Sequence, residues 1–100
     1  MIDNQTVTRE QYLTFLASAN RTVELFMDYS HDRAHARSSY KKIQHIKHLK
    51  AFHDTSLKLA KDVVDVAFEC WKNEYPLPAS ANDQALEDLR AKLTGNRNQF

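Results

Sequence analysis

Residues 57–71 read LKLAKDVVDVAFECW and carry the clearest structural signal in the chain. Apolar side chains recur there at steps of three and four residues, in two adjacent rows: Leu57, Ala60, Val64, Ala67 and Trp71, and Leu59, Val63, Val66 and Cys70. Both rows lie on one side of an α-helix, because such a helix turns once every ~3.6 residues. This wide apolar face predicts that a helix over about 55–74 forms the centre of the core.

The N-terminal part of the chain predicts a second helix. Thr8-Arg9-Glu10-Gln11 fits a capping box, in which Thr8 covers the backbone amide of Gln11 and the Gln11 side chain reaches back. Val7 and Tyr12 occupy the two positions of a hydrophobic staple around this box. An apolar stripe then continues for about 20 residues at helical spacing, through Tyr12, Phe15, Leu16, Ala19, Val23, Phe26 and Met27.

Capping side chains must mark the helix ends between Met1 and Tyr75, because this stretch contains no glycine or proline. The best candidates are Ser30, Asp32 and Asp54, whose side chains compete for backbone amides. We predict breaks near 28–33 and 52–56, with one continuous long helix as the alternative. The middle helix between them, about 33–52, has a poor apolar stripe: Ala36, Tyr40 and Ile43 share one face, and Ile46 and Leu49 lie beside it.

The C-terminal quarter predicts a last, short helix. Pro76 and Pro78 end the preceding helix, and a new one is capped by Ser80 or Asn82 and stopped by Gly95. Its apolar positions are Leu86, Leu89 and Leu93. With a polar lead at 1–7 and a frayed tail at 96–100, residues 1–100 are expected to form one all-α domain, a bundle of three long helices plus a short C-terminal helix.

Composition excludes several functional classes. The 100 residues include one glycine, two prolines and one cysteine. Glycine-rich phosphate loops and dinucleotide-binding motifs are therefore excluded, as are an intrachain disulfide and a zinc site built on two or four cysteines. A single thiol without a secretion signal predicts a cytoplasmic protein. No apolar run is long enough to predict a membrane span.

Basic residues are concentrated in one part of the chain, although the net charge is only +1. Residues 31–53 hold six Lys and Arg against one Asp, together with all five histidines, whereas residues 1–30 and 54–75 each carry a net charge of −2. On a helix, Arg37, Lys41, His45, His48 and Phe52 fall within about 80° of one another. The predicted binding residues are Arg33, Arg37, Lys41, Lys42, His45, Lys47, His48, Lys50 and Phe52.

Three interpretations of this basic stripe remain open. It pairs with the acidic segments of its own chain, it binds an acidic surface of another protein, or it binds nucleic-acid phosphates while histidines and Phe52 stack on bases. Because no helix-turn-helix glycine, RNP motif or zinc finger is present, a protein partner is the preferred of the two binding hypotheses. The sequence thus predicts a small non-catalytic adaptor, inhibitor or other regulatory protein without cofactors. Nucleic-acid binding is the alternative, a histidine-dependent pH or metal switch is the third hypothesis, and a homodimer is a further option.

Three other sets of residues could have a functional or a structural role. Asp28, His31, Asp32 and His35 would share one face of an unbroken helix and are a weak candidate for a zinc or other divalent-metal site, with helix capping as the alternative. Cys70 lies among apolar residues, which predicts an inert buried thiol and not a nucleophile. Trp71 and Tyr75, next to Pro76-Leu77-Pro78, either close the core or anchor an interface.

Overall fold

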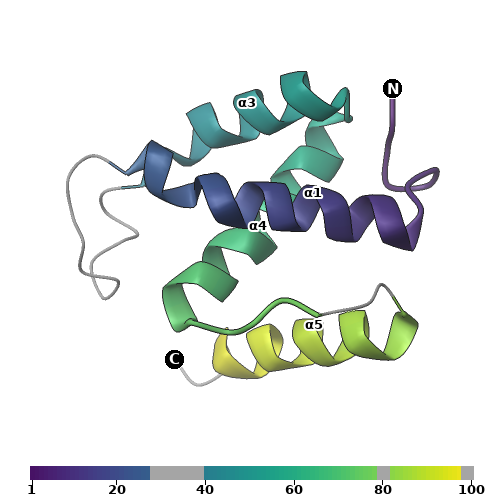
Figure 1. Ribbon diagram of the computed structural model, residues 1–100, viewed down its shortest axis with the longest axis vertical. Coiled ribbons are helices and arrows are strands. Elements are labelled where there is room, and N and C mark those ends of the chain that lie inside the picture. The colour runs from purple at the N-terminus through teal and green to yellow at the C-terminus, as the bar shows by residue number, and fades with distance from the viewer. Residues whose placement is uncertain (28–39, 79–81, 98–100) are drawn as a thin grey trace.

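Helix α4 (Leu57–Asn73) is the central element of the computed structural model, which describes residues 1–27, 40–78 and 82–97. Helices α1 (Arg9–Thr22), α3 (Lys42–His53) and α5 (Asp83–Arg97) all contact it. A 3-10 helix, η1 (Val23–Phe26), directly follows α1. Figure 1 shows α1 crossing in front of α4, with α3 on one side of α1 and α5 on the other. The prediction of an all-α bundle of three main helices and a C-terminal helix is confirmed.

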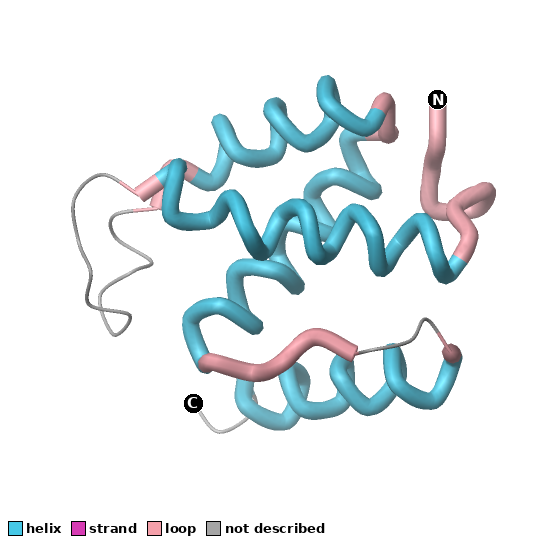
Figure 2. Tube along the Cα trace, in the orientation of Figure 1, coloured by secondary structure: helices cyan, strands magenta, loops and turns pink. Residues whose placement is uncertain are grey.

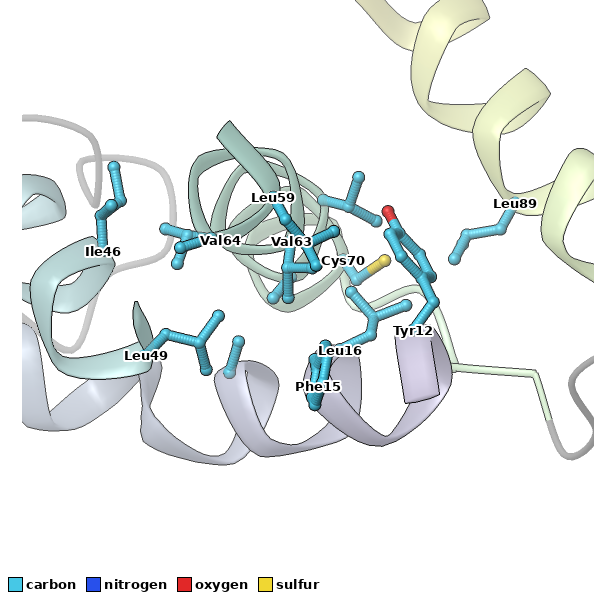
Figure 3. Close-up of a cluster of buried hydrophobic side chains, with 14 of the residues drawn as sticks. Tyr12, Phe15, Leu16, Ile46, Leu49, Leu59, Val63, Val64, Cys70 and Leu89 are labelled. Atoms are coloured by element: carbon cyan, nitrogen blue, oxygen red, sulfur yellow. The ribbon is translucent and has the colours of Figure 1, made fainter. Parts of the chain in front are cut away.

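The main core lies where the other helices meet α4, as Figure 3 shows. Leu16 from α1, Leu49 from α3 and Leu89 from α5 are buried against the predicted apolar rows of α4. A hydrogen bond also joins α1 to α4: the Asn20 side-chain amide of α1 donates to the Ala67 carbonyl of α4 at 3.3 Å. The predicted central role of 57–71 is therefore confirmed.

Two residues of α4 differ from the predicted pattern. Leu57, predicted to be in an apolar row, is 59% exposed because it is the first residue of the helix and lies beyond the helix crossings. Glu69, which the periodicity places on the polar face, is buried. The Asn73 side-chain amide donates to the Glu69 carboxylate at 3.3 Å, so this buried charge has a polar partner.

The start of α1 follows its sequence signal. The Gln11 backbone N–H donates to Thr8 Oγ1 at 3.1 Å, and the Thr8 backbone N–H donates to Gln11 Oε1 at 3.0 Å. These bonds satisfy two amides that a helix N-terminus otherwise leaves without intrahelical partners. Val7 and Tyr12 both pack in the main core cluster, which agrees with the predicted staple.

We expect Thr8→Ala to lower the free energy of unfolding by about 1 kcal/mol, since it removes the capping hydroxyl while leaving the core intact. Urea denaturation followed by circular dichroism would measure this change. Thr8→Ser, which keeps the hydroxyl, is expected to stay close to the wild-type value. Equal losses in both variants would contradict a role for the capping box.

The predicted long N-terminal helix is wrong at its C-terminal end. The α-helix stops at Thr22, continues as η1, and gives way to extended backbone at Met27. The Lys41 backbone N–H donates to the Phe26 carbonyl at 2.7 Å, and Met27 forms an antiparallel bridge with Tyr40. The break expected near 28–33 therefore begins at Met27, and one continuous helix is excluded. The predicted caps Ser30 and Asp32 lie outside the described residues.

The middle helix begins at Lys42 and not near residue 33, because Tyr40 forms a bridge with Met27 and the Lys41 N–H donates to the Phe26 carbonyl. The predicted apolar face is also wrong: Ile43 is 67% exposed, whereas Ile46 and Leu49 are buried. Ala36, the other residue assigned to that face, lies outside the described residues. Packing against α4 thus selects a different side of this weakly amphipathic helix.

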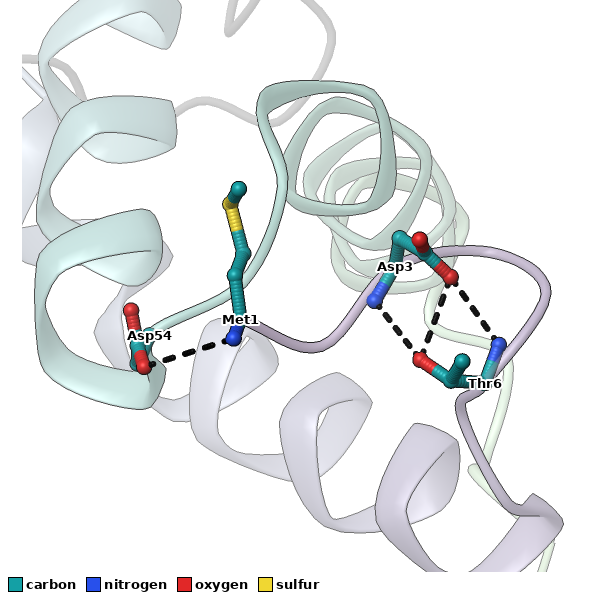
Figure 4. Close-up of polar contacts among 4 residues, drawn as sticks. All are labelled: Met1, Asp3, Thr6 and Asp54. Carbon is teal, nitrogen blue, oxygen red and sulfur yellow. Dashed lines mark hydrogen bonds and ion pairs between the residues drawn. The ribbon is translucent and has the colours of Figure 1, made fainter.

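The second predicted break, near 52–56, is confirmed and forms an elbow, Asp54–Ser56, between α3 and α4. Asp54 ends α3 in the left-handed region with φ 51°, and Ser56, not Asp54, caps α4 by accepting from the Leu59 N–H. The N-terminal lead braces this elbow, since the Ile2 N–H donates to the Asp54 carbonyl and the Ile2 carbonyl accepts from the Ser56 N–H. Figure 4 shows this segment beside the elbow, with an Asp3–Thr6 turn following it.

At the C-terminal helix, Asn82 is confirmed as the cap, because its side-chain oxygen accepts from the Ala85 N–H at 2.8 Å.

The predicted stop at Gly95 is wrong: α5 continues through Gly95 to Arg97, because glycine permits a positive φ but does not impose one. The first two residues of the predicted tail, 96 and 97, are consequently helical, and 98–100 lie outside the described part. Figure 2 shows the loop that follows α4 and, after it, α5 as the last helix of the chain. None of the described helices is long and apolar enough to cross a membrane.

Candidate binding surface on α3

The solvent side of α3 combines positive charge with exposed apolar side chains. Helix α3 contains no Asp or Glu. Lys47, His48 and Lys50 are exposed on it, and Lys41 is exposed directly before it. Ile43 and Phe52 are 67% and 71% exposed, so α3 also presents apolar side chains to solvent. We call this set the α3 surface: Lys41, Ile43, Lys47, His48, Lys50 and Phe52.

Two of the predicted binding residues lie elsewhere. The Lys42 ammonium forms an ion pair with Asp65 of α4, which supports internal pairing for this lysine. His45 is fully buried and therefore does not belong to the exposed stripe. The remaining predicted binding residues, Arg33 and Arg37, lie outside the described part of the chain, as do the four metal candidates Asp28, His31, Asp32 and His35.

His45 connects three segments through hydrogen bonds. Its Nε2 lies 2.8 Å from Thr22 Oγ1 at the end of α1, and its Nδ1 is hydrogen-bonded to the Tyr40 hydroxyl. The Thr22 hydroxyl also lies 3.0 Å from the Ser18 carbonyl. One proton arrangement satisfies every group: Tyr40 donates to Nδ1, Nε2–H donates to Thr22, and Thr22 donates to Ser18. His45 is therefore a neutral structural residue in the folded protein.

The electrostatics around His45 agree with this assignment. Burial lowers the pKa of His45 to about 4, and the nearby His48 lowers it further in the same direction. Burial also raises the pKa of Tyr40, with Asp65 adding to the effect, so its phenol keeps the proton that it donates. Sequence reasoning missed this role because His45 was assigned to the basic stripe. The available signal was its spacing four residues before Leu49, on the side that α3 buries.

Neighbouring rings hold the exposed Phe52 in place. Its ring centroid lies 6.0 Å from that of His48 and 4.8 Å from that of His53. His48 in turn lies 5.5 Å from Phe26, and His53 lies 4.6 Å from Phe15 of α1. Burial lowers the pKa of His53, which favours the neutral imidazole in this apolar contact. Phe52 therefore presents a large apolar surface with restricted side-chain freedom.

The aromatic residues near the end of α4 support the core interpretation. Trp71 packs with Tyr40, Met27 and the buried pair Val23 and Phe68 in a second apolar cluster. Its indole N–H donates to the Glu24 carboxylate at 3.3 Å, so it also ties α4 to η1. Tyr75 and Leu77 pack against the main core.

Cys70 is buried in the main core, as predicted from its apolar neighbours. Burial raises the pKa of its thiol to about 11, and Glu69 adds to this effect. The thiol is therefore protonated at neutral pH, whereas the nucleophilic form of cysteine is the thiolate.

A groove of about 280 Å³ lies between the start of α1 and α5. Two of its lining residues, Tyr12 and Arg90, interact with Asp62 of α4: the Tyr12 hydroxyl donates to Asp62 at 2.9 Å, and the Arg90 guanidinium lies 3.7 Å from Asp62 and 5.2 Å from the centre of the Tyr12 ring. Tyr12 and Asp62 thus join α1 to α4, and Arg90 joins α5 to both. These three residues hold α1, α4 and α5 together beside the groove, and the sequence did not predict their interactions.

Comparisons with protein-family models, curated proteins and solved structures gave no match to this chain. Within residues 1–27, 40–78 and 82–97, no three His, Cys, Asp or Glu side chains are grouped so that they could hold a metal ion. The charge and exposed apolar area of the α3 surface are therefore the features on which a functional proposal can be based.

Proposed function

We propose that this protein is a small, non-catalytic interaction or regulatory protein that binds an acidic protein partner through the α3 surface. The observation that carries the proposal is the exposure of Ile43 and Phe52 among lysines on a helix without carboxylates. Such a surface matches a partner that supplies both carboxylates and apolar side chains. A cytoplasmic location fits the single, buried cysteine, since reducing compartments keep thiols free.

The three lysines of α3 have two different roles in this proposal. Lys42 is paired with Asp65 on α4 and contributes to the fold. Lys47 and Lys50 extend from the exposed side of α3, where they steer an acidic partner toward the helix. Phe52 then acts as an apolar anchor, because its ring is already ordered by His48 and His53.

Single-stranded nucleic acid is the second candidate, and the observation that favours it is the exposed Phe52 ring on a helix that also exposes Lys47 and Lys50. An aromatic side chain beside cationic groups can stack on an unpaired base while the lysines contact phosphates. Ile43 distinguishes the two candidates, because an exposed aliphatic side chain contributes to a protein interface but not to phosphate binding.

We expect Lys47→Glu/Lys50→Glu to abolish partner binding, because it places repulsive charges opposite an acidic surface. Tagged wild-type and variant proteins would be used in pull-downs with quantitative mass spectrometry, followed by affinity measurements on the purified partner. Lys92→Glu, on the exposed side of α5, is the matched control and is expected to bind normally.

The same proteins would be titrated with labelled random-sequence oligonucleotides at 50 and 200 mM salt. We expect no binding at either concentration. Micromolar binding that weakens steeply with salt and disappears in the double variant would instead identify the α3 surface as a nucleic-acid site.

A further inference from the structure

Exposed apolar side chains gather at the elbow between α3 and α4. Phe52, in the last turn of α3, is 71% exposed, and Leu57, the first residue of α4, is 59% exposed. Met1 is also exposed, and its amino group lies 3.9 Å from the carboxylate of Asp54 in the elbow, as Figure 4 shows. We call these three residues the elbow patch. Phe52 belongs to the α3 surface as well, so the two are continuous.

The backbone that carries the elbow patch is already fixed. Ser56 caps α4 and so sets the position of Leu57. Two backbone hydrogen bonds hold Ile2 against the elbow and position Met1. The rings of His48 and His53 restrict Phe52. Binding through this patch would therefore require little additional ordering of the protein, which favours affinity.

Exposed lysines flank the patch on both helices, and Asp3 lies two residues from Met1 on the N-terminal lead. Lys50, Lys58 and Lys61 are exposed within one or two helical turns of the elbow. Asp54 is the only carboxylate in the segment from residue 47 to residue 61, and it is paired with the amino group of Met1. The patch is thus an apolar surface with a cationic border, and its charge complement is an anionic partner that also carries large apolar side chains.

We propose that the elbow patch and its lysines bind an amphipathic acidic segment of the protein partner. The apolar side chains of that segment cover Phe52 and Leu57, and its carboxylates pair with Lys50, Lys58 and Lys61. This inference rests on the proposed function and extends it, since it adds the start of α4 to the α3 surface. It also specifies the class of partner: a peptide that combines acidic and large apolar residues at helical spacing.

The test uses fluorescence anisotropy with the full chain and two labelled synthetic peptides. One peptide carries Glu and Leu at helical spacing, and the second has Ser in place of each Leu, so that both have the same charge. We expect the Leu peptide to bind at least about tenfold more tightly than the Ser peptide, since one factor of ten corresponds to burying a single apolar side chain.

Phe52→Ala/Leu57→Ser is expected to weaken binding of the Leu peptide by about tenfold or more. Leu25→Ser is the matched control, because Leu25 is equally exposed but lies on η1, which contacts the start of α3 and not the elbow. The affinity of this variant for the Leu peptide is expected to stay within about twofold of the wild-type affinity. All variants replace exposed side chains, and thermal melting by circular dichroism would confirm that each is folded.

The outcomes separate this inference from the proposed function. If Phe52→Ala/Leu57→Ser binds like wild type while Lys47→Glu/Lys50→Glu fails, neither the elbow patch nor the Phe52 anchor has a role, and binding depends on the lysines of the α3 surface. If neither variant changes binding, both proposals are wrong. If the Leu peptide does not bind but phosphatidylserine vesicles do, and the elbow variant loses that binding, the patch faces a lipid surface and the inference of a protein segment is overturned.

Discussion

Leu59→Ala is expected to lower the free energy of unfolding by about 3–5 kcal/mol, the upper range for truncating a buried leucine. Leu59 is fully buried in the main core, where α4 meets the other helices (Figure 3). Alanine at this position removes apolar contacts and leaves a cavity that a close-packed interior cannot fill completely. Urea denaturation monitored by circular dichroism would measure this loss of stability. The urea concentration at the midpoint of unfolding is expected to fall, and the dependence of the unfolding free energy on urea concentration to stay unchanged.

Leu57→Ala provides the matched control two residues away on the same helix. Because Leu57 is mostly exposed, its truncation is expected to change the free energy of unfolding by less than about 1 kcal/mol. Similar losses in the two variants would mean that α4 is rotated from the orientation described here. A small effect at Leu57 would also show that this side chain is available for binding at the elbow.

Lowering the pH from 7 to 4 is expected to destabilise the fold through His45. Its pKa is about 4 when folded, against an ordinary value of 6.5. Between these values the unfolded chain takes up a proton that the folded protein does not bind, so stability is full above about pH 6.5 and falls as the pH decreases toward 4. At about 1.4 kcal/mol for each pKa unit, the loss from His45 reaches about 3 kcal/mol.

His45→Gln separates this contribution from other titrations. The groups that face His45 are Thr22, Tyr40, Phe26 and His48, of which His48 lowers its pKa. His53 also has a lowered pKa and adds to the acid sensitivity of both proteins. We expect the variant to be less stable at pH 7 but to lose less stability between pH 6.5 and 4. Parallel curves of unfolding free energy against pH would contradict the assignment of His45 as a buried neutral group.

The basic segment shows how far the candidate site follows from sequence alone. Lys41, Lys47, His48, Lys50 and Phe52 were predicted as binding residues and are exposed on α3 or directly before it, although their role in binding stays a prediction. Lys42 and His45 could not be separated from them by composition, because the same residue types serve for binding, for ion pairs and for buried hydrogen bonds. Only the neighbours in space distinguish these uses: Asp65 for Lys42, and Thr22 with Tyr40 for His45.

Local patterns in the amino-acid sequence are sufficient to predict the all-α class, the central position of α4, the capping box at Thr8 and the cap at Asn82. These features depend on interactions within one or two helical turns, so adjacent residues are sufficient to specify them. Tertiary structure alone decided where α3 begins, which side of it is buried, and that Met1 and Leu57 lie at one elbow. The physical reason is that hydrogen bonds and packing between segments distant in the chain outweigh the weak local preferences at those positions.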